Sequence, residues 1–214
     1  MRLILLFLAL AFATPAAAGP ASKPTPGLVR VRIVTSLGAF VLALDARRAP
    51  KTTANFMAYV DDRRLDNTSF YRAARSKTSA EYGFIQGGIG TDARRMLPSV
   101  PLEPTNRTGI RHLDTAISMA HGRDENGATG NFAIMLGAHP SMDAKPGYSG
   151  YAAFGHVVEG MDTVRRILAQ PIGAGSGPMK GQMILKPIKL IRAERIDGTP
   201  KPTGAVQPWL IGVK

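Results

Sequence analysis

Short segments with the alternating pattern of β-strands recur along most of this 214-residue chain, whereas only two stretches have helical periodicity. The helical stretches begin near Pro50 and Gly160. Alternating βαβ units would require a helix after nearly every strand, so the pattern favours a mainly β fold, a closed β-barrel capped by helices. The expected strands lie at residues 29–34, 39–44, around 70 and 84, 115–120, 131–136, 151–158 and 188–196.

The composition fits a single globular domain without cross-links. Apolar residues make up 44% of the chain and charged residues 20%, which is an ordinary balance for a folded domain. The sequence contains no cysteine, so the domain has no disulfides and must be stabilised by packing. We expect the domain to span residues 28–197 and a weakly structured tail to follow at 198–214.

The amino-terminal residues 1–18 have the pattern of a secretory signal peptide. Arg2 supplies a charge, residues 3–13 are apolar, and an Ala-Ala-Ala cleavage site ends the segment. The apolar run is too short to cross a bilayer, and no later stretch approaches the roughly 20 apolar residues of a transmembrane helix. We therefore expect an exported, soluble protein, periplasmic or secreted, that begins at Gly19 with a disordered leader at 19–27.

The chain carries a formal net charge of +12, but its basic residues are scattered. They form separated pairs, such as Arg47-Arg48 and Arg165-Arg166, and not one continuous run. This spread favours a solvated basic surface over a nucleic-acid site, and export also argues against nucleic acid as a partner. Attraction to an anionic membrane surface is an alternative that the sequence leaves open.

Arg72 and Gln86 stand in aromatic and apolar surroundings on two successive strand-like segments. In an extended chain Phe70 and Arg72 share one face while Tyr71 takes the other, and Phe84 and Gln86 share a face of the next strand. If the two strands are neighbours, Arg72 and Gln86 project beside an apolar wall. The same spacing also fits an arginine that reaches from a sheet edge to water and a glutamine on the surface.

The histidines are candidate metal ligands by residue type only. They lie on separate segments, without the short spacing of metal sites, and no cysteine accompanies them. We expect isolated surface or core histidines and no metal, with substrate contact for His121 alone. The four are His112, His121, His139 and His156.

The glycine-rich residues 173–181 invite comparison with a phosphate-binding loop. The segment lacks the Gly-Lys-Ser or Gly-Lys-Thr ending of such a loop, so we expect a flexible connection.

Five segments in order carry a resemblance to a known family: APKTTANF at 49–56, SFYR at 69–72, GFIQGG at 83–88, SMA at 118–120 and FGHVVEGMD at 154–162. From about Leu28 to Ile196 the chain resembles a secreted bacterial cyclophilin-type peptidyl-prolyl cis-trans isomerase. The resemblance implies the cyclophilin-like β-barrel, in which eight antiparallel strands close and two α-helices cap the ends.

The resemblance also implies the reaction, which is rotation about the bond preceding proline in unfolded or flexible polypeptides. Arg72 matches the family's catalytic arginine, and Gln86 matches the glutamine that holds arginine and substrate in register. Ala120 and His121 belong to the segment that matches the one pairing with the substrate main chain. No cofactor and no metal is expected, and we expect a monomer.

The residues that match the family's proline pocket depart from its bulky aromatic pattern. Phe84 follows a glycine where the family commonly has Phe-Met, and Asn131 and Ala133 flank a phenylalanine where it has Gln-Phe-Phe. Ala133 therefore takes the place of the phenylalanine on the pocket floor. Met142 follows a serine where the family has an aromatic-Leu pair, and Tyr151 stands where it has a histidine or tyrosine. Replacing a buried Phe by Ala removes about 3–5 kcal/mol of packing, so proline binding should be weak unless Phe84 and Met142 refill the space.

Two functions fit these residues. The first is an exported prolyl isomerase that assists the folding of exported proteins. The second is a cyclophilin-fold module that binds peptides or proteins and has lost efficient turnover. Acceleration of cis-to-trans conversion in a proline peptide separates the two.

Overall fold

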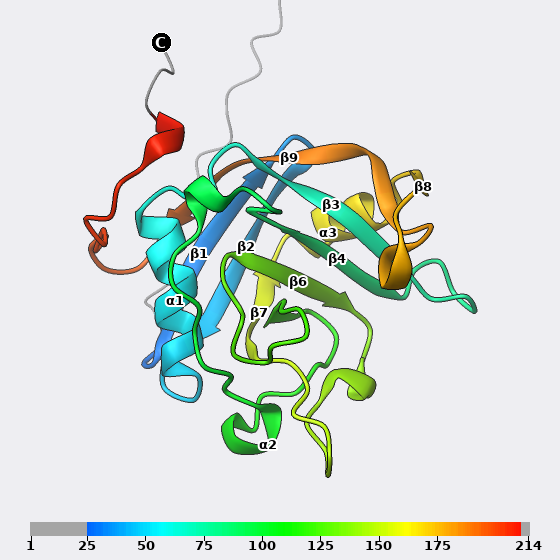
Figure 1. Cartoon of the computed structure of the whole chain (residues 1–214), viewed down its shortest axis with the longest axis horizontal. Helices are drawn as coiled ribbons and strands as arrows, with labels where there is room; N and C mark the ends of the chain where they lie inside the picture. The colour runs from blue at the N-terminus through cyan, green and yellow to red at the C-terminus, as the bar shows by residue number, and fades with distance from the viewer. Residues whose placement is uncertain (1–24, 211–214) are drawn as a thin grey trace, which may run out of the picture.

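The strands close into a barrel because β1 (Leu28–Thr35) is paired along both edges. The computed structural model describes residues 25–210, so the signal-peptide expectation falls outside the described residues. β1 pairs with β2 (Gly38–Asp45) on one side and with β9 (Met183–Arg195) on the other. The order around the barrel is β1-β2-β7-β5-β6-β4-β3-β9, and every pairing is antiparallel (Figure 1). The expected eight-stranded barrel is confirmed.

The other elements are placed largely where the sequence predicts strands and helices. The two-residue β8, the four-residue α2 and the 3₁₀ turns are additional to that prediction. The strands are β3 (Thr68–Arg75), β4 (Gly83–Gly88), β5 (Ala116–Met119), β6 (Asn131–Leu136), β7 (Ala153–Glu159) and β8 (Ile172–Gly173). The helices are α1 (Pro50–Asp61), α2 (Thr105–Thr108) and α3 (Met161–Leu168), with 3₁₀ turns η1 (Ala93–Arg95), η2 (Pro140–Met142), η3 (Gly177–Met179) and η4 (Pro208–Leu210).

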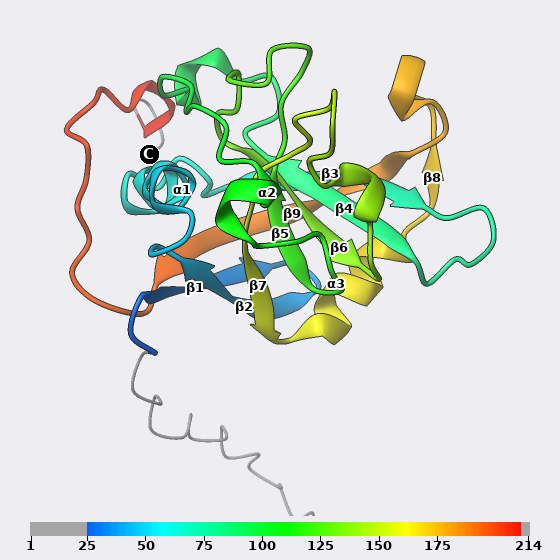
Figure 2. The same ribbon diagram turned by 90° about the horizontal axis from the view of Figure 1, so that it is seen from below.

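Helices α1 and α3 lie on opposite sides of the barrel (Figures 1 and 2). Helix α1 begins at Pro50, whose fixed φ suits a first turn, and Glu103 accepts hydrogen bonds from the Thr52 N–H and hydroxyl, both at 2.7 Å. A carboxylate there also opposes the positive end of the helix dipole. Helix α3 buries Val164 and Ile167 completely.

Phenylalanine rings fill the barrel interior and tie α1 to the sheet. Phe56 of α1 meets Phe132 of β6 edge to face, with ring centroids 5.2 Å apart, and Phe132 in turn meets Phe70 of β3 at 5.7 Å. Each of these side chains is at most 1% exposed. Edge-to-face contacts between buried rings add to the free energy gained by their burial, so this row is a main source of stability in a chain without disulfides.

A β-bulge in β3 overturns the expected alternation of side chains. Phe70 pairs with Gly87 and Arg72 pairs with Gln86, so Tyr71 is the extra residue in the ladder. Phe70 points into the core, whereas Tyr71 and Arg72 both reach the outer face, where Tyr71 bonds to Gln86. The prediction that Phe70 and Arg72 share a face was therefore wrong, and the bulge is the cause.

The segment after β9 is irregular, but it packs against the end of α1 (Figure 2). The Thr203 N–H and hydroxyl donate to Asp62 at 2.7 and 2.5 Å. Lys201 donates its N–H to Asp61 at 3.0 Å. Trp209 is only 8% exposed, so the tail is docked through both hydrogen bonds and an aromatic contact.

Arg64 is buried beneath this tail and is 1% exposed, so the expected solvated basic surface does not hold for this residue. Its Nε donates to Asp62 at 2.8 Å, and its two Nη groups donate to the carbonyls of Arg95 and Val206, both at 3.2 Å. The guanidinium carbon lies 4.7 Å from the centroid of Trp209. Burial would raise the pKa of Asp62, but the hydrogen bonds from Thr203 and Arg64 outweigh it and lower that pKa.

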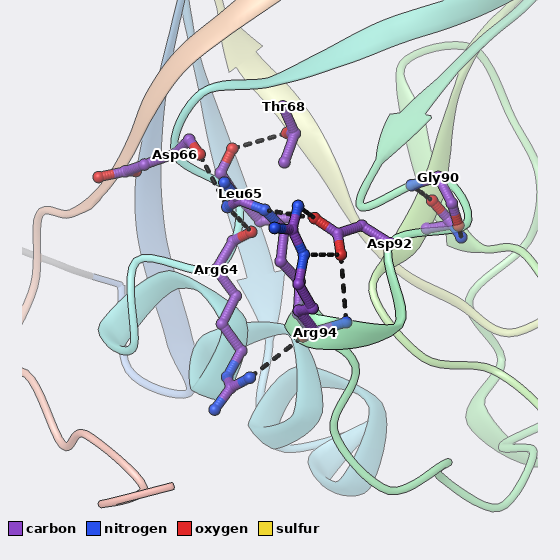
Figure 3. Close-up of polar contacts among 9 residues, drawn as sticks. Arg64, Leu65, Asp66, Thr68, Gly90, Asp92 and Arg94 are labelled. Carbon is purple, nitrogen blue, oxygen red and sulfur yellow. Dashed lines mark hydrogen bonds and ion pairs between the residues drawn. The ribbon is translucent and has the colours of Figure 1, made fainter. Parts of the chain in front are cut away.

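The neighbouring turn η1 completes this network. Arg95 donates from Nη1 to the backbone carbonyls of Arg64 and Asp66 at 2.8 and 2.9 Å. Asp92 accepts hydrogen bonds from Arg94 and precedes the turn (Figure 3). Arg95 also faces Trp209, with 5.1 Å from its guanidinium carbon to the ring centroid. Two cations therefore hold one indole.

We predict that Trp209→Ala lowers the free energy of unfolding by about 3 kcal/mol, the lower end for removal of a buried aromatic ring, because two cation–π contacts and the tail's anchor are lost together. Chemical denaturation followed by circular dichroism measures the change. Val206→Ala is the control, since that side chain is 73% exposed and only its carbonyl takes part. An unchanged midpoint for Trp209→Ala would show that the indole contributes nothing to stability.

Candidate functional site

A cavity of about 420 Å³ opens on the outer face of β3, β4 and β6. Three residues in a row across these strands form its centre, because Arg72 pairs with Gln86 and Gln86 pairs with Ala133. Apolar walls with a few convergent polar groups are the usual character of a small-ligand site. The lining residues are Arg72, Phe84, Gln86, Met119, Ala120, His121, Gly122, Arg123, Ala133, Met142, Tyr151, Pro178 and Met179.

Gln86 is fixed between Arg72 and Tyr71. Its Oε1 accepts from Arg72 Nη1 at 2.9 Å, and its Nε2 donates to the Tyr71 hydroxyl at 3.1 Å. These two partners determine which end of the amide faces the arginine. The placement supports the site interpretation of Arg72 and Gln86 over an arginine reaching to water and a surface glutamine.

The guanidinium of Arg72 is half-buried and held in an apolar setting. Its carbon lies 4.9 Å from the ring centroid of Phe84, and Nε and Nη2 both donate to Gln182 Oε1, at 2.9 and 2.7 Å. Burial lowers the pKa of Arg72, although an arginine remains protonated in proteins. The site therefore presents a fixed positive charge to whatever enters the cavity.

The floor of the cavity is filled from two sides. Ala133 is 4% exposed and packs with Ala116 and Met135, and Phe84 and Met142 lie against this cluster. Phe84 also meets His139 edge to face, with centroids 6.0 Å apart. Phe84 and Met142 thus occupy space beside Ala133. Tight proline binding was expected to depend on this filling.

His121 and Tyr151 form a further wall. Their rings stack with centroids 4.4 Å apart, and His121 Nε2 lies 3.1 Å from the carbonyl oxygen of Gly150. The Ala120 N–H donates to the carbonyl of Asn131 at 2.9 Å, so β6 holds this segment at the cavity edge. The structure brings both Ala120 and His121 to the cavity.

Asn131, an expected substrate-binding residue, is not among the residues that line the cavity of about 420 Å³. Its amide bonds to both backbone groups of Gly90, accepting at 2.8 Å and donating at 2.9 Å. It lines an adjoining hollow of about 590 Å³, which shares Gln86, Ala120 and His121 with the first cavity. Asn131 therefore fixes the loop after β4 and also lines the hollow beside the cavity, and its contact with substrate stays a prediction.

His112, Ser118 and Asp143 resemble a hydrolase triad in distance but not in access. His112 Nε2 lies 2.9 Å from Ser118 Oγ, and Nδ1 lies 2.7 Å from Asp143. Ser118 is fully buried, so no substrate reaches its hydroxyl. Burial lowers the pKa of His112, which favours the neutral ring. The group joins η2 to β5 beneath the cavity, as expected of a core histidine.

Within residues 25–210, no group of three or more His, Cys, Asp or Glu side chains is arranged to hold a metal ion. The polar side chains that line the cavity are those of Arg72, Arg123, Gln86, His121 and Tyr151.

Several contributors to the site are absent from the sequence-based interpretation, including Met119 and Arg123 of the cavity lining. Tyr71 reaches Gln86 only because of the bulge in β3. Pro178, Met179 and Gln182 belong to or follow the glycine-rich segment expected to be a flexible connection. The Gly-Pro pair at the start of η3 signals a turn, but nothing local indicates that the turn meets Arg72.

Comparison with known proteins agrees with this geometry. Residues 30–193 match the sequence profile of the family described as "Cyclophilin type peptidyl-prolyl cis-trans isomerase/CLD". The peptidyl-prolyl cis-trans isomerase cyp18 of Streptomyces antibioticus is 31% identical over 150 residues, covering 69% of this chain and 87% of the relative. Peptidyl-prolyl cis-trans isomerase A of Dickeya dadantii is 29% identical over 167 residues, covering 76% of this chain and 84% of the relative.

A solved structure shows the same fold. The crystal structure of a Cryptosporidium parvum cyclophilin type peptidyl-prolyl cis-trans isomerase superposes with a TM-score of 0.64 and 20% identity, covering 80% of this chain and 99% of the other. With the profile match and the Streptomyces relative, it follows that the chain belongs to the family of cyclophilin-type peptidyl-prolyl cis-trans isomerases.

Proposed function

We propose that this chain accelerates cis-trans isomerisation of X-Pro bonds in unfolded or flexible polypeptides, with Arg72 as its catalytic residue. The observation that carries the proposal is a guanidinium fixed at the edge of an apolar cavity of about 420 Å³, with Gln86 bonded to it. The proline ring enters the cavity, and its amide lies against Arg72.

The reaction needs only this much chemistry. Amide resonance sets a rotation barrier of about 18–20 kcal/mol, and uncatalysed X-Pro isomerisation takes tens to hundreds of seconds. Twisting the amide localises the lone pair on the prolyl nitrogen, so a donor aimed at that nitrogen bonds the twisted state better than the planar one. Arg72 offers such a donor in surroundings of low polarity, where its interaction with a lone pair is stronger than in water.

The segment from Ala120 to Gly122 supports the substrate main chain. Because the Ala120 N–H already donates to Asn131, the substrate pairs with the Ala120 carbonyl. The stacked rings of His121 and Tyr151 bound the cavity on this side and limit the approach of water. We propose a monomeric protein that acts on polypeptides and not on nucleic acid.

In this pocket the large side chains that contact proline stand on different strands from those in the family pattern. The chain has Phe84 where the family commonly has methionine and Ala133 where it has phenylalanine. Because Phe84 packs against the cluster around Ala133, bulk lost from β6 is supplied from β4. The proposal therefore includes productive proline binding.

We predict that Ala133→Phe alone weakens proline-peptide binding, because the new ring competes with Phe84 for one space, and overpacking costs about 1–3 kcal/mol. Phe84→Met combined with Ala133→Phe should restore binding to within about threefold of wild type. Calorimetric titration with a proline peptide measures both. Stronger binding by the single variant would show that the space beside Ala133 is vacant.

We predict that Arg72→Ala lowers kcat/KM by about 10²–10³, the usual loss when one preorganised transition-state donor is removed. Arg72→Lys should also be poor, since a point-like ammonium does not reproduce the planar donor set that faces Gln86 and the substrate. A peptide isomerisation assay measures the rates, and circular dichroism confirms the fold. Full activity in folded Arg72→Ala would overturn the mechanism, and an inactive wild type that binds proline peptides would establish the binding-module alternative.

We further propose that the enzyme is exported and assists the folding of exported proteins, as a secreted or periplasmic bacterial member of the family. The support is the signal-peptide pattern of residues 1–18. No helix among residues 25–210 is long and apolar enough to cross a membrane.

We predict that the protein recovered from the exported fraction begins at Gly19, because the apolar run ends in a small-residue cleavage site. Intact-mass measurement tests this. A recovered mass that still includes residues 1–18 would contradict cleavage, and retention of the whole protein in the cytoplasm would contradict export.

A further inference from the structure

The donors of Arg72 are nearly all engaged within the protein. Nη1 donates to Gln86, Nε and Nη2 donate together to Gln182 Oε1, and Nη2 also donates to the Pro178 carbonyl at 3.3 Å. Four of the five N–H groups of the guanidinium therefore have partners. Among residues 25–210 the fifth, on Nη1, has none, and it is the donor left for a substrate.

The acceptors are neutral. Gln86 and Gln182 offer amide oxygens and Pro178 a backbone carbonyl, and none of the ion pairs among residues 25–210 includes Arg72. A carboxylate in their place would hold the guanidinium but would also offset its charge. Two amide oxygens at opposite ends of the group define its plane and leave its charge available.

Gln182 is itself held by the barrel. Its carbonyl accepts from the Ala73 N–H at 2.9 Å, and the next residue, Met183, pairs with Arg72 in the β3–β9 ladder. Its own N–H donates to the Met179 carbonyl at 3.0 Å. The side chain of Gln182 therefore starts from a fixed backbone directly across from Arg72.

The glycine-rich turn before Gln182 brings a second acceptor, the Pro178 carbonyl, to Arg72. Gly175 has φ +84°, and a Cβ there would lie 2.3 Å from the Met179 carbonyl oxygen, so no larger residue fits without displacing the turn. The Gly181 N–H donates to the Ala174 carbonyl at 2.5 Å and closes the loop. This closure places the Pro178 carbonyl on Arg72 Nη2.

We propose that Gln182 is a positioning residue for the isomerase reaction, which with Gln86 holds the guanidinium of Arg72 in its productive plane before substrate binds. The inference rests on the proposed function of Arg72. A long arginine side chain loses considerable conformational entropy when it is fixed. Because Gln86 and Gln182 fix it in the folded protein, this entropy is lost during folding and not in the transition state.

The first test is kinetic. Gln182→Leu removes the acceptor at similar size, and it should lower kcat by about tenfold, less than Arg72→Ala, with KM changed less than twofold. Gln170→Leu is the matched control, because among the described residues its side-chain amide bonds only to the Arg166 carbonyl of the preceding helix α3, and it should keep wild-type rates. In the Arg72→Ala background Gln182→Leu should have no further effect. An equal tenfold loss in that background would overturn the proposal, because Gln182 would then act independently of Arg72.

The second test does not depend on activity. In ¹H–¹⁵N spectra the Arg72 Nε–H should exchange slowly with water in the wild type and at least about tenfold faster in Gln182→Leu, because its acceptor is gone. The Gln170→Leu control should retain slow exchange. Equal exchange in wild type and Gln182→Leu would overturn the positioning role. If the wild type is inactive yet the exchange difference is present, the proposed function fails while the fixing of Arg72 by Gln182 stands.

Discussion

The pairing of β1 on both edges holds the barrel closed, and the site depends on that closure. Arg72, Gln86 and Ala133 come from three adjacent strands and meet in one row because the antiparallel register is continuous from β3 through β4 to β6. Gln182 joins them from β9's end of the same sheet. A barrel with its interior filled by phenylalanine rings cannot shift one strand without moving its neighbours, so the row is rigid.

Arg64 and Arg72 are both shielded from water, but their hydrogen-bond partners suit them to different roles, one in stability and one in the proposed chemistry. Arg64 is fully buried and has a carboxylate partner, Asp62, with carbonyls and the Trp209 ring completing its contacts. Arg72 is half-buried and contacts only neutral acceptors and the face of Phe84. Breaking a buried pair leaves an uncompensated charge, which makes Arg64 a structural residue. A cation whose charge is not offset interacts strongly with an incoming lone pair, and this is the property that the isomerase proposal requires of Arg72.

The barrel could be predicted from the sequence, because strand alternation is a local pattern, and the family-like segments indicated most of the residues that line the cavity. The side of the sheet that Tyr71 occupies could not be predicted from the sequence, since a bulge depends on how two strands pair and not on either strand alone. Gln182 was missed because its contact spans 110 residues and follows a segment whose glycines indicate flexibility. In the structure those glycines permit a turn that the Gly181 N–H closes by donating to the Ala174 carbonyl.

The pocket shows why a departure at one position cannot be interpreted alone. Loss of a buried phenylalanine costs about 3–5 kcal/mol when the space stays empty, but exchanges that conserve volume usually cost less than about 1.5 kcal/mol. Ala133 lies against Phe84 and Met142, so the relevant quantity is the combined volume of three side chains from β4, β6 and η2. A proline ring is held by apolar contact, and the side chains that make this contact can come from any of these strands. What must stay in place is the direction of the guanidinium, which is set by the hydrogen bonds that Arg72 donates to Gln86 and Gln182.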